Sequence, residues 1–361
     1  MSDKKVLFIS YKVHPDKSVG AKRVSYWCQH LKRISPNYDV SVISSYQQES
    51  LNGVDNYYYL PEAAAPKGLI KDLGVTWKRS IKTFVEDNKL SFDIVLITGS
   101  PFMHFSLVSY FKKKGAKVVL DYRDPFAINP RFNNSAIKKA IKSFYEKRFN
   151  KLADKILTVN NFCLSLLCGF KDYPEKFSVI QNGYEEVAKD GDFELKKSGI
   201  NLLYAGTFFP DRNPKNLFAV IKDNSDFSFH HVGRQSDFTS GTAVNQYGFL
   251  SYSETITAIG QADVGMIFSS GLAFESTTKI YDYIYQKKVI WVISNQAITE
   301  GALWEDLKHY PAVVWTVNTE KNIAQDLKKV QALVGKSVEF NAEQFSREHG
   351  LWQLLEIFKK L

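Results

Sequence analysis

Short apolar runs alternate with longer amphipathic segments along the whole chain. The runs at 6–10, 94–98 and 289–293 are almost continuously apolar, as in strands buried on both faces of a parallel sheet. The intervening segments repeat apolar residues at helical spacing. Repeated strand–helix alternation predicts right-handed crossovers and a doubly wound parallel α/β sheet. In the first half, strands are predicted at 6–10, 40–44, 57–60, 94–98, 118–121, 155–159 and 177–181, and helices at 21–34, 69–88, 102–114, 136–153 and 162–169.

The amino-acid composition changes after Asn182-Gly183, and this change predicts a domain boundary. Residues 184–198 are polar and charged, which predicts an interdomain linker. A second alternation then predicts strands at 200–205, 226–232, 243–249, 263–268, 289–293 and 312–316, and helices at 214–222, 253–261, 278–286, 300–307 and 321–334. Because 361 residues exceed one ordinary core, we predict two Rossmann-like domains, 1–183 and 199–340, facing across a cleft. C-terminal helices at 341–361 follow, and packing back on the first domain is one option for them.

The stretch from 268 to 294 places polar residues between a strand and a helix. Free N–H groups and the helix dipole favour phosphate at such a strand-to-helix junction. The alternative is an ordinary surface loop in which Ser276 or Thr277 caps the helix. Helical spacing puts Asp282 one turn after Thr278. The polar residues of this stretch are Glu275, Ser276, Thr277, Thr278, Lys279 and Asp282.

Other predicted strand ends carry similar side chains. Gly20 precedes a helix and could let a ligand approach the backbone closely, although a plain β–α turn is equally consistent. Arg123 and Asp124 follow a buried strand, where charges need a partner or a function; their alternative is a structural ion pair. In the second domain, a glycine turn with basic residues beyond it suits a diphosphate. The residues in these loops are His14, Gly20, Arg123, Asp124, Gly206, Thr207, Arg212, Lys215 and Arg234.

Charge and motifs narrow the function. A net charge of +9 allows nucleic acid, an anionic membrane or a phosphorylated ligand as partner. No nucleic-acid-binding motif accompanies the charge, so nucleic acid is not expected. No Gly-x-Gly-x-x-Gly follows the first strand and no Walker lysine loop occurs, which argues against nicotinamide and P-loop chemistry. Cys163 and Cys168 lack metal-ligand spacing, and no metal or other cofactor is expected.

Localisation depends on the apolar runs and on one basic segment. No run approaches membrane-spanning length, and the five apolar residues near the start are too few for a signal peptide, so we expect a soluble cytoplasmic protein. Residues 136–151 are rich in lysine and arginine and carry apolar residues at helical spacing. Two interpretations stay open: a helix solvated on its basic face, or one docked on an anionic membrane.

Several motifs together resemble a known family, the GT-B glycosyltransferases of family four. They are Val6-Leu-Phe-Ile-Ser with Gly20-Ala-Lys-Arg-Val, Asp121-Tyr-Arg-Asp-Pro-Phe, Val179-Ile-Gln-Asn-Gly-Tyr, Leu203-Tyr-Ala-Gly-Thr and Ser276-Thr-Thr-Lys-Ile-Tyr-Asp-Tyr-Ile. The resemblance spans nearly the whole chain. It implies a retaining, nucleotide-sugar-dependent enzyme of hexosyltransferase type.

The resemblance also implies roles for residues. Glu275 would contact the donor sugar, Asp282 the ribose, and Lys279 the departing diphosphate, without a metal. The first domain would hold the acceptor through His14, Gly20 and Arg123. Catalytic roles are expected for Glu275, Lys279 and Asp124, and donor binding for Gly206, Thr207, Arg212, Lys215, Arg234, Ser276, Thr277, Thr278 and Asp282.

The chain departs from the family pattern at three places. Glu275 and Asp282 are one residue closer than the usual pair of acids, and Gln286-Lys-Lys-Val replaces the usual Gly-x-Pro. Thr207 stands where an arginine is usual, which leaves Arg212 or Lys215 to meet the phosphate.

We therefore expect sugar transfer from a nucleotide-sugar to a saccharide or lipid-linked saccharide in surface polysaccharide or glycolipid assembly. The alternatives are a nucleotide-sugar 2-epimerase of the same fold and a non-catalytic nucleotide-sugar-binding subunit.

Overall fold

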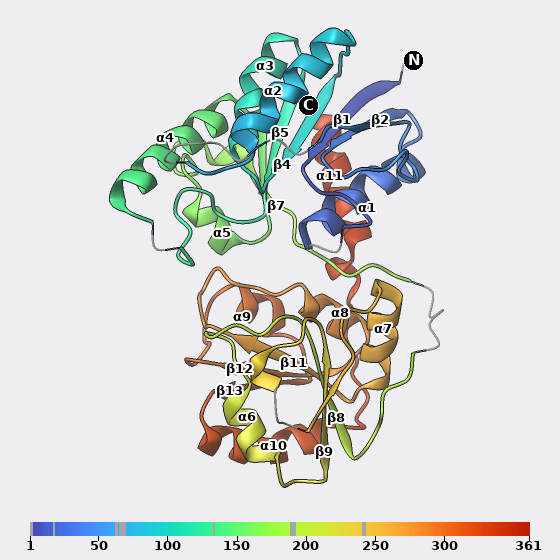
Figure 1. The fold of residues 1–361 in the computed structure, drawn as a ribbon, viewed down its shortest axis with the longest axis vertical. Coiled ribbons are helices and arrows are strands. Elements are labelled where there is room, and N and C mark those ends of the chain that lie inside the picture. The colour runs from blue at the N-terminus through green and yellow to red at the C-terminus, as the bar shows by residue number, and fades with distance from the viewer. Residues whose placement is uncertain are drawn as a thin grey trace. The chain divides into compact units, whose positions relative to one another are not determined.

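The chain folds into two compact units, each built around one parallel sheet (Figure 1). The computed structural model describes residues 3–16, 19–61, 64, 70–132, 134–187, 193–239 and 243–361. The first unit comprises Met1–Asn182 with Arg347–Leu361, and the second comprises Gly183–Ser346. The predicted fold class, two doubly wound parallel α/β domains, is confirmed.

The first unit has seven strands in the order β3-β2-β1-β4-β5-β6-β7, and every pairing is parallel. The strands are β1 (Lys4–Ser10), β2 (Tyr38–Ser44), β3 (Asn56–Tyr59), β4 (Ile94–Thr98), β5 (Lys117–Tyr122), β6 (Lys155–Thr158) and β7 (Phe177–Val179). Its helices are α1 (Val19–Ile34), α2 (Gly74–Asp87), α3 (Val108–Lys113), α4 (Ala136–Leu152), α5 (Asn161–Leu166) and α11 (Arg347–Lys360), with short 3₁₀ turns at Met103–Leu107 and Pro174–Lys176.

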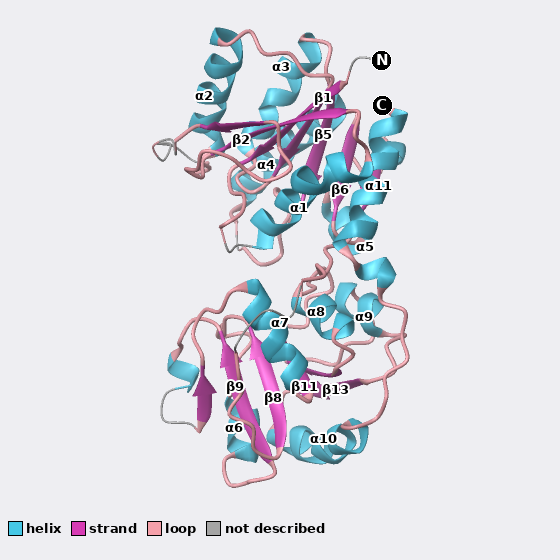
Figure 2. Ribbon diagram, turned by 90° about the vertical axis from the view of Figure 1, so that its right-hand side faces the viewer, coloured by secondary structure: helices cyan, strands magenta, loops and turns pink. Residues whose placement is uncertain are grey.

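Both faces of this sheet are covered by helices (Figure 2). Successive side chains of a strand point to opposite faces, so Leu7 and Ile9 join the core under α2 and α3. Val6 and Phe8 join a separate core under α1 and α11. Because both faces of β1 are buried, its sequence is a continuous apolar run and does not alternate between apolar and polar residues.

The second unit has six strands in the order β10-β9-β8-β11-β12-β13, again all parallel. The strands are β8 (Ile200–Ala205), β9 (Phe227–Val232), β10 (Val244–Gln246), β11 (Val264–Ser269), β12 (Val289–Ser294) and β13 (Val313–Val317). Its helices are α6 (Lys215–Ile221), α7 (Tyr252–Gln261), α8 (Lys279–Tyr285), α9 (Ala302–Leu307) and α10 (Glu320–Leu333), with 3₁₀ turns at Asp237–Thr239 and Glu343–Phe345.

Helix α8 is held on the second sheet by a ring that fits over a glycine. Tyr283 is fully buried, and a Cβ added at Gly265 of β11 would lie 2.5 Å from its ring. The Tyr283 hydroxyl lies 3.2 Å from the Leu203 carbonyl oxygen and 3.3 Å from that of Met266. The helix that follows the polar stretch is therefore fixed against both β8 and β11.

The chain end returns to the first unit. Leu351, Leu354 and Phe358 of α11 are fully buried in the core that contains Phe8. Arg33 of α1 pairs with Glu348 at 3.0 Å. The segment predicted as 341–361 is thus divided, because Phe345 stays in the core of the second unit while α11 packs on the first.

Residues predicted as a linker, 184–198, pack on the second unit where the structure describes them. The Tyr184 ring stacks on Tyr285 at 4.5 Å between centroids, and Leu195 is buried in the same core. Residues 188–192 lie outside the described residues. The polar composition of 184–198 predicted a linker. The packing of Tyr184 was not predictable, because its aromatic partner Tyr285 is distant in sequence.

Candidate functional site

An ion pair joins two loops that leave neighbouring strands of the second sheet. Arg212 lies in the loop after β8, and Glu275 lies in the loop after β11. Arg212 Nη1 is 3.1 Å from Glu275 Oε1, and Ser270 Oγ donates to Glu275 Oε2 at 2.5 Å. The Arg212 guanidinium also lies 4.5 Å from the centroid of the Phe209 ring. Glu275 is 7% exposed, so this largely buried carboxylate depends on its cation and hydroxyl partners.

A second ion pair lies on the first turn of α8. Lys279 Nζ is 3.0 Å from Asp282 Oδ2, and the Tyr252 hydroxyl donates to Asp282 Oδ1 at 2.8 Å. Asp282 is buried, whereas the Lys279 side chain keeps some exposure. An ammonium group can donate three hydrogen bonds, so Lys279 retains capacity for a further anion. Tyr252 was missed at the sequence level, because it lies 30 residues before Asp282 on another helix.

The predicted cap of α8 is wrong. The helix begins at Lys279, its N-cap residue is Thr278, and no side chain caps it. Ser276 Oγ instead donates to the buried Asp306 at 2.7 Å. Thr277 Oγ1 is 3.5 Å from the Lys279 backbone nitrogen, the outer limit for a hydrogen bond. Only the fold brings Asp306 near Ser276, and donation to that carboxylate orients the Ser276 hydroxyl toward Asp306.

A close backbone contact orders the glycine turn after β8. Gly233 has φ +151°, and a Cβ there would lie 2.1 Å from the Gly206 carbonyl oxygen. The buried His231 donates from Nε2 to the same oxygen at 2.8 Å. Of the remaining predicted donor residues, Thr207 and Arg234 are exposed. Lys215 lies over the Phe238 ring at 5.6 Å, so the structure does not bring it to Glu275.

The first unit has a buried ion pair that differs from the one considered above. Asp121 is fully buried and pairs with Arg23 at 3.3 Å, while Thr98 Oγ1 donates to it at 3.1 Å. Arg23 also donates to the carbonyl oxygens of Ile180 and Gln181. Arg23 is thus the ion-pair partner in this segment, and it ties β5 to the loop after β7.

Arg123 fills the space that Gly20 leaves open. A Cβ at residue 20 would lie 1.2 Å from Arg123 Nη1, and Arg123 Nε donates to the Gly99 carbonyl oxygen. Burial lowers the pKa of Arg123, and the nearby carboxylates of Asp121 and Asp124 oppose that shift. Gly20 therefore admits a protein side chain here. His14 is exposed, and its backbone N–H donates to Ser25 Oγ at 2.7 Å.

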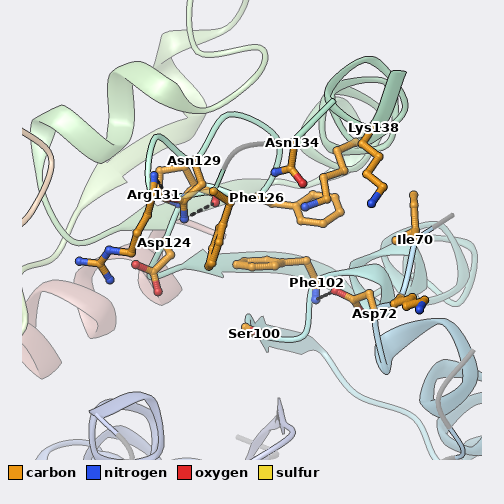
Figure 3. Close-up of a pocket in the computed structure, with 14 residues that line it drawn as sticks. Ile70, Asp72, Ser100, Phe102, Asp124, Phe126, Asn129, Arg131, Asn134 and Lys138 are labelled. Atoms are coloured by element: carbon orange, nitrogen blue, oxygen red, sulfur yellow. Dashed lines mark hydrogen bonds between the residues drawn. The ribbon is translucent and has the colours of Figure 1, made fainter. Parts of the chain in front are cut away.

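Asp124 borders a pocket of about 650 Å³ in the first unit (Figure 3). Ser100 and Asp124 follow the carboxyl ends of β4 and β5, where ligands of open α/β sheets bind. Phe102 and Phe126 form aromatic walls, with ring centroids 5.0 Å apart. Lysines of α4 complete the lining. The sequence marked these lysines as basic but gave no signal that they border a pocket.

Metal and membrane features complete the description. Within the described ranges, no group of three or more His, Cys, Asp or Glu side chains is placed to hold a metal ion. Among the helices that the structure describes, none is long and apolar enough to cross a bilayer.

One known protein family matches the first part of the chain. Residues 20–186 match the family model of Glycosyltransferase Family 4. The predicted resemblance to this family is confirmed over these residues, which form most of the first unit. Comparison with curated protein sequences gives no match.

Solved structures share the fold over the whole chain. Sucrose-phosphate synthase from Thermosynechococcus elongatus is 10% identical, with a TM-score of 0.69 over 99% of this chain and 98% of that one. The catalytic domain of starch synthase IV from Arabidopsis thaliana, bound to ADP and acarbose, is 12% identical, with a TM-score of 0.64 over 99% of each chain. UDP-GlcNAc 2-epimerase from Neisseria meningitidis is also 12% identical, with a TM-score of 0.60 over 99% of this chain and 100% of that one. The chain has the GT-B fold, which glycosyltransferases and 2-epimerases share.

Proposed function

We propose that the protein is a glycosyltransferase that moves a sugar from a nucleotide-sugar to a saccharide or lipid-linked saccharide acceptor, with retention, in surface polysaccharide or glycolipid assembly. One observation carries the proposal: the second unit holds two ion pairs, Arg212–Glu275 and Lys279–Asp282. Arg212 and Glu275 lie in loops at the carboxyl ends of adjacent parallel strands, and Lys279 begins the helix after the second of these loops. The family match of the first unit supports the same conclusion.

The chemistry needs stabilisation of a leaving diphosphate. As the bond between the sugar carbon and the diphosphate oxygen breaks, negative charge develops on that oxygen, and Lys279 is the proposed cation beside it. Asp282 positions Lys279 through their ion pair, and Glu275 is the proposed contact for the sugar hydroxyls. The hydroxyl oxygen of the acceptor forms the new bond to the sugar carbon, with Asp124 as the proposed hydrogen-bond acceptor for that hydroxyl, and the released proton leaves with the diphosphate. Charge stabilisation by side chains makes a metal ion unnecessary in this proposal.

A binding screen and one variant test the proposal. A nucleotide present at one hundred times its dissociation constant stabilises its binding unit by about 2.7 kcal/mol, which a thermal-shift screen of nucleotides and nucleotide-sugars detects. Lys279→Met should abolish turnover while folding stays intact. Lys222→Met is the matched control, because its side chain is 70% exposed. Wild-type turnover in Lys279→Met would refute the site, and retained binding without turnover in the wild type would favour a non-catalytic subunit.

A nucleotide-sugar 2-epimerase is the second candidate, because such enzymes share this fold over the whole chain. The two functions differ in their products. A transferase releases nucleoside diphosphate only when an acceptor is present, whereas an epimerase interconverts nucleotide-sugars without one. Chromatography of the nucleotide products with and without acceptor therefore separates them.

Helix α4 is the proposed contact with an anionic membrane. Ile137 and Phe144 are 67% and 63% exposed and lie opposite Glu146, the fully buried acid of this helix. Its exposed charges are therefore all positive, which is the pattern of an interfacial helix. The apolar stripe considered in the sequence splits between two faces, since Phe149 is buried in the core.

Vesicle co-sedimentation tests the membrane contact. Burying an Ile or Phe side chain contributes about 1.5–3 kcal/mol, so the double variant Ile137→Ser, Phe144→Ser should bind phosphatidylglycerol vesicles at least about tenfold more weakly. Trp352→Ser on α11 is the control, because Trp352 is also exposed. Equal sedimentation with anionic and neutral vesicles would contradict this part of the proposal.

A further inference from the structure

The pocket beside Asp124 has features of a small-molecule site that the proposed roles leave unused. Its volume of about 650 Å³ lies within the range of about 300–1,000 Å³ typical of ligand sites. Ser100 and Asp124 lie at its strand-end side, and Lys138 and Ile70 lie at the opposite side (Figure 3). The pocket is formed within the first unit alone.

Basic side chains line the pocket. Lys138 and Lys142 are one helical turn apart on α4 and both line the pocket, as does Lys71. Like charges at this spacing repel each other, and an anion between them relieves the repulsion. No ion pair joins Lys138 or Lys142 to a carboxylate of the described residues. Desolvation lowers the pKa of Lys142, Lys138 lowers it further, and Asp72 and Glu146 oppose the shift.

Asp72, a carboxylate of the pocket lining, is already engaged. Asp72 accepts hydrogen bonds from the backbone N–H groups of Gly74, Phe102 and Met103 at 2.8–3.1 Å. Its charge is thereby used to hold the start of α2 and the turn before α3. The lysines of α4 therefore remain available to an anion that enters from solvent.

The walls of the pocket suit the rest of such a ligand. Phe102 and Phe126 present apolar faces, and Lys142 Nζ lies 5.1 Å from the centre of the Phe126 ring. Asn134 and Asp124 add polar groups that can bind hydroxyls. A ligand that satisfies all of these walls has an anionic group, a compact body with apolar faces, and hydroxyls.

We infer that this pocket binds a phosphorylated saccharide, with its phosphate between Lys138 and Lys142 and its ring against Phe102 and Phe126. A hydroxyl of the saccharide then reaches Asp124. This inference rests on the proposed function, because it identifies the acceptor as a phosphate-bearing sugar. The phosphate can belong to a soluble sugar phosphate or to the headgroup of a lipid.

Two binding arms test the inference on the full chain. In the first, glucose 6-phosphate and neutral glucose are titrated by calorimetry. Since a hydrogen bond to a charged group is worth enough for about a tenfold or larger change in affinity, glucose should bind at least about tenfold more weakly. Lys138→Gln and Lys142→Gln should each weaken glucose 6-phosphate binding by a similar factor. Lys139→Gln, an exposed neighbour outside the pocket lining, should stay within about twofold of the wild type.

The second arm uses vesicles that contain phosphatidic acid. The control in this arm is Lys113→Gln, because Lys113 is an exposed lysine of α3 and lies outside both α4 and the pocket lining. If the phosphate belongs to a lipid, Lys142→Gln should reduce vesicle capture more than Lys113→Gln, while soluble glucose 6-phosphate binds weakly to all variants. If it belongs to a soluble sugar, the soluble probe alone distinguishes Lys142→Gln from its control. The inference is overturned when neither probe distinguishes Lys142→Gln from its control.

Nucleotide binding separates this inference from the proposed function. Nucleotide stabilisation is assigned to the second unit, so it should be lost in Lys279→Met and kept in Lys142→Gln. Phosphate binding that depends on Lys142, in a protein that no nucleotide stabilises, would retain the pocket and refute the glycosyltransferase. The reverse result would refute the pocket alone.

Discussion

Substitutions at the two residues of the Arg212–Glu275 ion pair should have different effects on nucleoside diphosphate affinity. Arg212 is the proposed contact for the donor diphosphate, yet in this structure it is paired with Glu275. Glu275→Gln removes the competing charge and preserves the shape of the side chain. It should leave nucleoside diphosphate affinity unchanged or increase it, while turnover of the nucleotide-sugar is lost. Arg212→Met should weaken the same affinity by about 10- to 100-fold, the value of a hydrogen bond to a charged group.

The burial of the pair sets the cost to stability. The side chains of Arg212 and Glu275 are 18% and 6% exposed, so removing either leaves a charge largely shielded from water. Breaking a buried pair at one side costs about 3 kcal/mol. The loss in Arg212→Met is reduced by the hydrogen bond from Ser270, which remains. The double variant Arg212→Met, Glu275→Gln should recover about 1–3 kcal/mol relative to the sum of the single losses.

Hydrogen exchange of β11 amides during a urea titration measures this coupling in the second unit. Calorimetry with a nucleoside diphosphate and a turnover assay provide the functional measurements. Lys222→Met, which removes one exposed charge from the same unit, is the control for a general charge effect.

Two results would refute the reasoning. A coupling energy below about 0.5 kcal/mol would mean that the two residues act independently. A diphosphate affinity that falls in Glu275→Gln as much as in Arg212→Met would mean that the pair binds the ligand as one unit and does not compete with it.

Three further predictions concern stability. Burial holds the pKa of His104 at about 3, below the unfolded value of 6.5, so protonation favours unfolding and stability falls with pH below 6.5. Between pH 6.5 and 5 the wild-type first unit should lose about 2 kcal/mol more than His104→Gln in urea titrations, because the raised pKa of Glu146 contributes the opposite trend to both proteins; an equal pH dependence of the two would contradict this. Lys287 has φ +52°, so Lys287→Gly should stabilise the second unit by about 1 kcal/mol, and a lower urea midpoint would contradict this. Gly20→Ala should displace the Arg123 side chain and destabilise the first unit by about 1–3 kcal/mol; a crystal structure with Arg123 unmoved would refute that reasoning.

The strands, and their place in parallel sheets, were predictable because a strand buried on both faces has apolar residues at nearly every position of its own sequence. The runs at 6–10 and 289–293 are apolar at nearly every position, and both lie inside parallel sheets with helices on either side. The turn between α8 and β12 was not predictable in this way: Lys287 has φ +52° although it is not a glycine, whereas Gln286, at the position of the family glycine, has φ −82°.

Partner choice at the candidate site was not predictable, because the partners are far apart in sequence. Ser276 or Thr277 is the cap of α8 that local sequence predicts, but in the fold the Ser276 hydroxyl donates to Asp306 and no side chain caps the helix. Arg23 reaches Asp121 across 98 positions, and neither residue marks the other locally. Side-chain oxygens and guanidinium groups bind the nearest suitable partner in space, so their roles follow from packing.

The sequence by itself determined two doubly wound α/β domains and the polar stretch from 268 to 294, since both follow from periodicity and from the chemistry of neighbouring residues. The tertiary structure decided that Glu275 pairs with Arg212, that Tyr252 supports Asp282, and that α4 turns Lys142 toward a pocket. The physical reason is range: a hydrophobic pattern is set by one segment, whereas a charge or a hydroxyl is satisfied by whichever segment the fold brings within about 3 Å.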